Sequence, residues 1–133
     1  MGGGAASSSG SAFVTLSSTA PAGDRSWQVS ENNATGEDAK VAAFALCASV
    51  PGYVVAHGLV LSIPGNSIAS LGARCPGDKL PTGGGSVIQS KSIGAYLNLT
   101  EFGDSHDWVS FVTNTSAVPF KASTTIVCAT VPK

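Results

Sequence analysis

Residues 121–129 read KASTTIVCA, and residues 40–48, which lie 81 positions earlier, read KVAAFALCA. The earlier stretch belongs to a segment (residues 36–48) that is rich in helix formers and has Glu37 and Asp38 near its start, as a helix would. The later stretch is rich in β-branched residues, which favour strands. Because equivalent segments of a repeat should share one conformation, we predict a strand at both places.

The repeat covers residues 2–52 and 83–133 without a gap. Its identical positions include both tryptophans of the chain and two of its three cysteines. The clearest matches are Gly2-Gly3-Gly4 with Gly83-Gly84-Gly85, Trp27 with Trp108, Asn33 with Asn114, Cys47-Ala48 with Cys128-Ala129, and Val50-Pro51 with Val131-Pro132. A repeat constrains the architecture before any functional motif is considered.

Strand signals dominate both copies, because short alternating or β-branched runs are separated by turns rich in glycine, proline and aspartate. We therefore predict an all-β fold of two related antiparallel meanders with internal pseudo-twofold symmetry, packed as a sandwich or in a prism-like arrangement. The expected strands are residues 12–18, 27–32 and 41–50 in the first copy and 86–90, 95–101, 108–114 and 124–131 in the second.

Three parts of the chain follow from this pattern. We expect residues 1–53 to form a first β repeat and residues 83–133 a second, joined by a connector at residues 54–82 within one compact domain. The connector has no counterpart elsewhere in the chain. It is expected to contribute two strands, residues 54–63 and 67–75, on either side of a Pro-Gly-Asn turn.

The first copy begins directly at its glycine triplet, whereas the second is preceded by Cys75-Pro76. We therefore expect the first repeat to lack its Cys-Pro strand and the true N-terminus to lie upstream of Met1. No signal peptide is visible after Met1.

Charge is scarce: only 11% of the residues are charged and the formal net charge is −1. The chain therefore offers no basic footprint for nucleic acid and no basic amphipathic face for a membrane surface. Its apolar runs are too short to insert as a membrane-spanning helix. A surface coated by serine, threonine, asparagine and glycine is common in secreted β-proteins, and we predict a secreted protein.

The three cysteines suggest one disulfide and one unpaired thiol. We favour a Cys75–Cys128 bond, which would join the first and last strands of the second unit. The first alternative is a Cys47–Cys75 bond between the copies, and the second is three reduced thiols that are buried as small apolar side chains. No CxxC motif and no suitably spaced histidine is present, so we expect no metal and no other cofactor.

The densest polar cluster is the run Asp104-Ser105-His106-Asp107, just before Trp108. A catalytic triad needs side chains that converge in space, whereas consecutive residues of a turn or strand point apart. The first copy has no histidine at the matching place. We interpret the run as a hairpin turn, with a calcium or sugar site at Asp104 and Asp107 as the alternative, and we predict no catalytic residue.

Trp27 and Trp108 are expected to anchor the core of one repeat each, and the alternative is a pair of sugar-stacking platforms. Together with Asp104 and Asp107, they are the candidate ligand-binding residues. The glycine triplets do not form a phosphate loop, because no Lys-Ser/Thr pair follows them. We expect them to permit a bulge or a close approach between strands.

The second unit carries an ordered series of motifs: Cys75-Pro76-Gly77, Gly83-Gly84-Gly85, Trp108, Asn114-Thr115-Ser116 and Val127-Cys128-Ala129. This order resembles repeats of secreted actinobacterial proteins. The resemblance covers the second unit fully and the first without its Cys-Pro, and it departs from the pattern where Gly77 directly follows Pro76. It implies export, a disulfide between the Cys-Pro and Val-Cys-Ala positions, and no catalytic residues.

Duplication without a convergent acid–base set favours a non-enzymatic extracellular binding or structural module, with a carbohydrate or another protein as its partner. One alternative is a small hydrolase built around His106 with Asp104 or Asp107. The other is a proteinaceous inhibitor whose contact loop lies in residues 54–82. An open sheet edge or Cys47 also offers a route to a homodimer.

Overall fold

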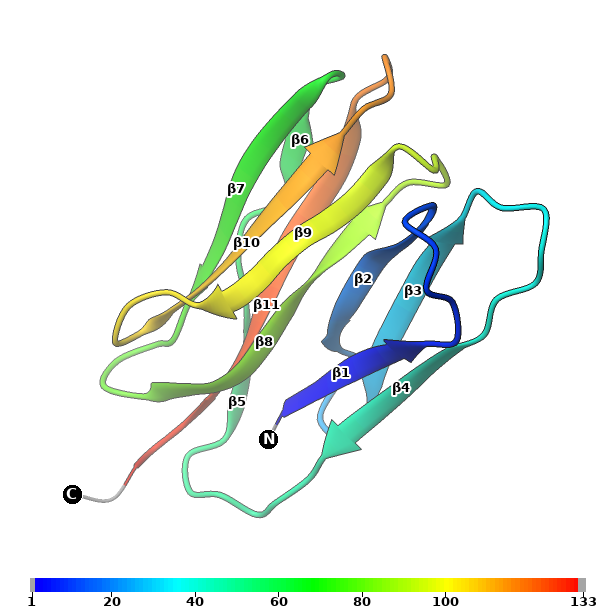
Figure 1. The fold of residues 1–133 in the computed structure, drawn as a ribbon. Coiled ribbons are helices and arrows are strands. Elements are labelled where there is room, and N and C mark those ends of the chain that lie inside the picture. The colour runs from blue at the N-terminus through cyan, green and yellow to red at the C-terminus, as the bar shows by residue number, and fades with distance from the viewer. Residues whose placement is uncertain (1, 132–133) are drawn as a thin grey trace.

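The computed structural model describes residues 2–131, and these residues form eleven strands and no helix (Figure 1). Every strand pairing is antiparallel, and the predicted all-β, sandwich-like fold is confirmed. The strands are β1 (Gly2–Ser7), β2 (Val14–Pro21), β3 (Trp27–Asn33), β4 (Val41–Leu46), β5 (Val54–His57), β6 (Leu61–Ile63), β7 (Ser67–Arg74), β8 (Leu80–Gln89), β9 (Ala95–Phe102), β10 (Asp107–Asn114) and β11 (Phe120–Ala129).

The strands form three sheets, in the orders β1-β4, β7-β10-β9 and β3-β2-β8-β11-β5, with β6 also paired to β11. The β7-β10-β9 sheet lies across the face of β8 and β11, as Figure 1 shows. Apolar side chains from both sheets meet between these layers in two clusters. The larger cluster contains Ile63, Leu71, Ile88, Ala95, Val112, Phe120 and Ala122, and the smaller one contains Ala73, Cys75, Ile126 and Cys128.

Strand pairing in the first unit recurs 81 residues later. Gly3 lies opposite Ala45 where β1 pairs with β4, and Gly84 lies opposite Ile126 where β8 pairs with β11. The β2–β3 and β9–β10 hairpins also share one register, and each has an irregularity at the same place. Identical residues at matching positions therefore occupy matching places in the two units.

The meander order that we predicted within each copy is not observed. A meander pairs consecutive strands, whereas here the first strand of each unit pairs with the fourth and the second with the third. The glycine strand and the hairpin consequently lie in different sheets. A tryptophan of the hairpin packs against a glycine of the first strand in each unit, Trp27 against Gly3 and Trp108 against Gly84. This packing explains why a tryptophan and a glycine triplet both recur.

The connector forms three strands rather than the two that we predicted. β5 and β6 both pair with β11, and the strand pairing is interrupted between them, near Gly58. Position 58 requires glycine, because a Cβ atom there would lie 2.0 Å from the carbonyl oxygen of Gly72. β7 pairs with β10, so all three connector strands belong to the second unit.

The segment that resembled a helix is a strand, as the repeat predicted. β4 spans Val41–Leu46, shorter than the expected residues 41–50, and all six of its residues are exposed. Its counterpart β11 is almost entirely buried. Two strands with the same pairing register therefore have opposite environments.

Candidate functional site

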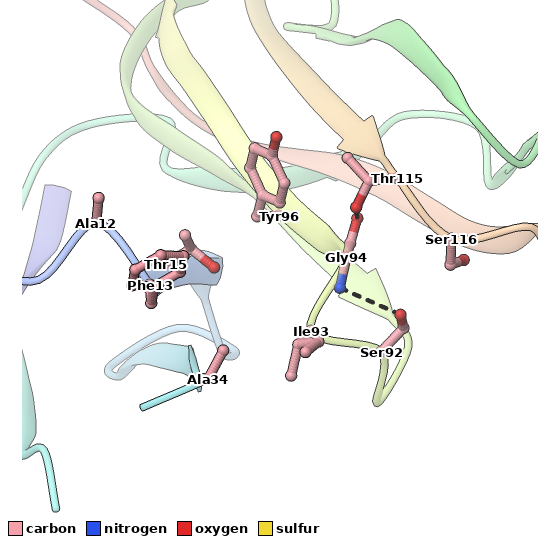
Figure 2. A pocket seen from close by; sticks show the side chains of 10 residues that line it. All are labelled: Ala12, Phe13, Thr15, Ala34, Ser92, Ile93, Gly94, Tyr96, Thr115 and Ser116. Carbon is pink, nitrogen blue, oxygen red and sulfur yellow. Dashed lines mark hydrogen bonds between the residues drawn. The ribbon is translucent and has the colours of Figure 1, made fainter. Parts of the chain in front are cut away.

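A groove of about 510 Å³ opens between the loop that precedes β2 and the loop that precedes β9 (Figure 2). This volume falls within the usual range of small-molecule sites. Phe13 and Ile93 are 70% and 62% exposed, and Tyr96 of β9 is half-buried. None of the lining residues is charged. They are Ala12, Phe13, Thr15, Ala34, Ser92, Ile93, Gly94, Tyr96, Thr115 and Ser116.

Serine hydroxyls hold both loops in the same way. In each loop, two successive serine Oγ atoms accept hydrogen bonds from backbone N–H groups two residues further on. In the first loop, Ser9 accepts from Ser11 and Ser11 accepts from Phe13. In the second loop, Ser90 accepts from Ser92 and Ser92 accepts from Gly94, and all four bonds measure 3.1–3.2 Å. Asn32 connects the units at this point, because its Nδ2 donates to the carbonyl of Ala95 at 2.7 Å. These hydrogen bonds constrain both loops that form the walls of the groove.

Sequence reasoning did not identify the groove. One signal was available: Ile93 is a large apolar residue within a stretch of serine and glycine, outside every expected strand, whereas Phe13 was assigned to the expected strand 12–18. Sequence periodicity carries no information about two loops 81 residues apart lying side by side, so the groove itself appears only in the tertiary structure.

Trp27 and Trp108 are half-buried and make equivalent contacts. The indole Nε1 of Trp27 donates to Thr19 Oγ1 at 2.8 Å, and that of Trp108 donates to Thr100 Oγ1 at 2.7 Å. A Cβ atom at Gly3 would lie 2.3 Å from the Trp27 ring, so the ring sits directly on the glycine strand. One face of each indole is therefore covered by its own unit, and neither tryptophan lines the groove. Their role in ligand binding stays a prediction.

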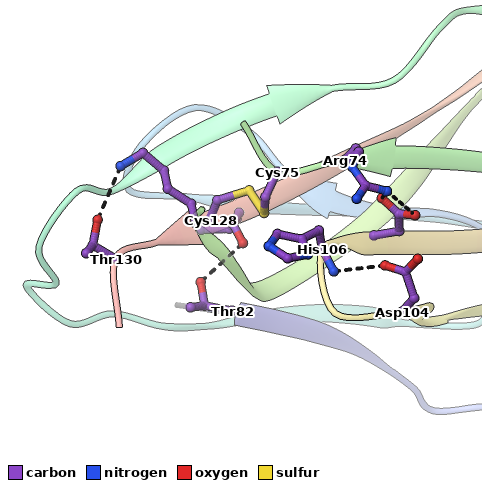
Figure 3. Close-up of a disulfide and its surroundings, with 10 residues drawn as sticks. Arg74, Cys75, Thr82, Asp104, His106, Cys128 and Thr130 are labelled. Atoms are coloured by element: carbon purple, nitrogen blue, oxygen red, sulfur yellow. Dashed lines mark hydrogen bonds and ion pairs between the residues drawn. A yellow bond between two sulfur atoms is a disulfide. The ribbon is translucent and has the colours of Figure 1, made fainter. Parts of the chain in front are cut away.

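Asp104 lies in the turn between β9 and β10, and Asp107 is the first residue of β10. Asp104 Oδ1 accepts the backbone N–H of His106 at 2.9 Å, and both carboxylate oxygens of Asp107 accept from Arg74 Nη1, at 2.9 and 3.0 Å (Figure 3). Ser105 Oγ lies 2.8 Å from His106 Nδ1. The Asp104 carboxylate is thus engaged within the turn, and that of Asp107 by the neighbouring strand β7.

The Asp104 contact leads to a prediction about pH. Its hydrogen bond from the His106 backbone lowers the pKa of Asp104 below the usual value, and the charge of Arg74 acts in the same direction. A depressed pKa in the folded state stabilises the fold above the ordinary pKa of about 4, and this stabilisation is lost as the pH falls through the folded value. We expect an NMR titration of the Asp104 carboxyl carbon to show the lowered pKa in the native protein and the ordinary one in urea. Equal values in both states would contradict the assignment.

The disulfide joins Cys75, just after β7, to Cys128 of β11, with a Cα–Cα distance of 5.7 Å (Figure 3). The favoured pairing is thus confirmed, and both alternatives, a Cys47–Cys75 bond and three reduced thiols, are wrong. Cys47 has an exposed free thiol. A structural disulfide is compatible with an extracellular location, because such bonds persist in oxidising compartments.

Among residues 2–131, no three histidine, cysteine, aspartate or glutamate side chains gather in a way that would hold a metal ion. None of these residues belongs to a helix that is long and apolar enough to cross a membrane. Comparisons of the chain with protein-family models, with curated proteins and with solved structures found no match.

Proposed function

We propose that this protein is a non-enzymatic extracellular binding module whose groove binds a neutral carbohydrate. The observation that carries the proposal is the chemistry of the groove: an uncharged lining, two aromatic rings at Phe13 and Tyr96, and several hydroxyl groups. Sugar rings have apolar faces that pack on aromatic rings, and their hydroxyls bond to serine and threonine. A charged ligand would find no opposite charge among the residues that line the groove.

The placement of the acid–base groups supports binding rather than catalysis. Ser105, His106 and Asp107 lie in or next to the β9–β10 turn, outside the groove. Asp107 is paired with Arg74, and within residues 2–131 no hydrogen bond joins His106 to Asp107 as a triad requires. Within the groove, the only titratable side chain is that of Tyr96.

We also propose that the two units arose from one ancestral repeat and that the protein is secreted. The shared strand registers and the equivalent tryptophan and asparagine contacts support the first point. Asn33 Nδ2 donates to the Glu37 carbonyl as Asn114 Nδ2 does to Val118, at 2.8 and 2.9 Å. The disulfide and the low charge support the second, as does the resemblance to secreted actinobacterial repeats.

Groove binding predicts a selective loss in the variant Phe13→Ser. In NMR titrations with cello-, chito- and malto-oligosaccharides, we expect the amide signals of residues 12–15 and 92–96 to shift with at least one of these sugars. Loss of the exposed ring should weaken that affinity by about tenfold or more, which corresponds to about 1.4 kcal/mol.

Phe102→Ser is the matched control, because Phe102 is also an exposed aromatic residue but lies outside the groove. Its affinity should equal that of the unchanged protein. An absence of shifts with every sugar would refute carbohydrate binding. Shifts centred on the two indole N–H signals would instead place the site at Trp27 and Trp108.

A further inference from the structure

The exposed strand β4 has a buried counterpart, β11, and the residues that pack on β11 indicate what kind of segment fits on β4. On one face of β11, Ile126 and Cys128 pack against Ala73 and Cys75 from the β7 side of the sandwich. The matching face of β4 and the residue after it carries Val41, Ala43, Ala45 and Cys47, all exposed. Because side chains alternate along a strand, these four residues point the same way.

Three strands complete the second unit. β5 and β6 pair with the outer edge of β11, and β7 pairs with the outer edge of β10. The first unit has no strand in these places among residues 2–131: β4 pairs only with β1, and β3 is the end of its sheet. Both edges therefore present unpaired backbone N–H and C=O groups, which readily accept another strand.

The first unit has a backbone position that matches the one to which Cys75 is hydrogen-bonded in the second. Cys75 donates its backbone N–H to the His106 carbonyl at 2.8 Å, and Arg25 occupies the place of His106 in the repeat. A hollow of about 700 Å³ lies between Arg25, Cys47 and Tyr53. The Cys47 thiol is thus positioned beside a space that the second unit fills with its Cys-Pro segment.

Asn33 indicates the other end of the same surface. Asn114 Nδ2 donates to the carbonyls of Ile63 and Pro64, at 3.3 and 3.0 Å, where the chain passes from β6 to β7. Asn33 repeats the local turn contacts of Asn114 and is exposed. Within residues 2–131, the first unit has no segment that matches the β6–β7 connection and would offer Asn33 such carbonyls. Groups that match the contacts of the β7 segment thus lie at both ends of the exposed β3–β4 surface, Arg25 at one end and Asn33 at the other.

We propose that the β3 edge, β4 and the hollow beside Cys47 form an acceptor site for a β-segment of a different polypeptide. The segment has the pattern of residues 66–77: small and apolar residues at alternate positions, then Cys-Pro. It pairs with β3 as β7 pairs with β10, and its cysteine forms a disulfide with Cys47. Strand addition of this kind uses main-chain hydrogen bonds for affinity and alternate side chains for specificity.

Residues 66–77 of a second copy are not the occupant. Residues 67–74 of each copy are paired with that copy's own β10, and its Cys75 is bonded to Cys128. Moving this segment to a partner would break its pairing with β10 and its disulfide in the donor, and it would form only the same kind of contacts in the acceptor. The occupant therefore carries a Cys-Pro strand that is not already paired and bonded.

Bond formation with Cys47 proceeds by thiol–disulfide exchange. The Cys47 thiol gives its proton to solvent, and the thiolate attacks the cysteine sulfur of a segment that carries a glutathione mixed disulfide. The bond to glutathione breaks, the Cys47 disulfide forms, and glutathione leaves as its thiolate. The mixed disulfide is the oxidant, so no other electron acceptor is needed.

The test uses a peptide with the sequence of residues 66–77, NSIASLGARCPG, whose cysteine carries glutathione. Mass spectrometry follows adduct formation on the full chain, and hydrogen exchange follows the amides of β3. We expect the adduct to form at least tenfold faster than with a scrambled peptide of the same composition. The β3 amides should become protected in the adduct.

Two exposed alanines of β4 provide matched variants. Ala45→Glu places a charge on the acceptor face and should reduce the rate to that of the scrambled peptide. Ala42→Glu places the same charge on the opposite face and should leave the rate unchanged. Cys47→Ser should abolish the adduct while leaving reversible protection of β3.

Equal rates for the two peptides would show that Cys47 is only an accessible thiol, and the proposal would fail. An adduct without protection of β3 would refute strand pairing. If size-exclusion chromatography instead shows that oxidation yields mainly a Cys47–Cys47 dimer in the presence of the peptide, a second copy is the occupant and the proposal is overturned.

Discussion

Replacing Cys75 and Cys128 together by alanine is expected to lower the free energy of unfolding by about 4 kcal/mol. The disulfide links residues 53 positions apart, and a closed loop of this size removes much of the conformational entropy of the unfolded chain. Both cysteines are buried in the smaller apolar cluster, so the alanines also leave some space unfilled. For a chain of this length, the change corresponds to a fall in Tm of about 14 °C.

Urea denaturation monitored by tryptophan fluorescence and by circular dichroism measures this loss. Cys47→Ser is the control, since the Cys47 thiol is exposed and unbonded, and it should change the free energy of unfolding by less than about 0.5 kcal/mol. A double variant that loses less than about 1 kcal/mol would mean that the disulfide constrains the unfolded chain far less than its loop length requires.

The variant Gly85→Ala is expected to cost about 3 kcal/mol, at the upper end for overpacking of a buried site. A Cβ atom at Gly85 would lie 1.8 Å from the carbonyl oxygen of Thr19, so the backbone of β2 would have to move. This contact joins the first unit to the second, because Thr19 lies opposite Ser86 where β2 meets β8. The substitution therefore disrupts the junction of the two units.

Gly4→Ala is the matched control, because Gly4 is the repeat counterpart of Gly85. A Cβ atom there would meet the ring of Phe44, an exposed side chain that can rotate away. We expect a loss below about 1 kcal/mol. Thermal and urea denaturation of the two variants measure the difference, and equal losses would show that the close approach of β2 to Gly85 does not hold the units together.

Several features were predictable because they are local or recur. The strand at residues 41–46 resembles a helix in isolation, but its counterpart at 121–129 is β-branched, and the shared register of the two confirms the comparison. The Cys75–Cys128 bond was also predicted, as a link between the first and last strands of the second unit. For the strand, the second copy supplied information that a single stretch lacks.

Other features depend on which segments meet in space. The need for glycine at position 58 follows from the approach of the Gly72 backbone, which no pattern in residues 54–63 indicates. The same is true of the groove at Phe13 and Tyr96, since it arises where loops from two units lie side by side. Non-local packing of this kind leaves no trace in a local pattern.

An all-β fold, a disulfide and two units with matching glycines and tryptophans were all predictable from the sequence alone. Strand formation follows from residue types and their alternation, which recur in both copies, whereas the order in which the strands pair was not predicted. Only the tertiary structure decided that β11 is buried while β4 is exposed. Burial depends on what packs against a strand, and the strands β5, β6 and β7 cover one of the two and not the other.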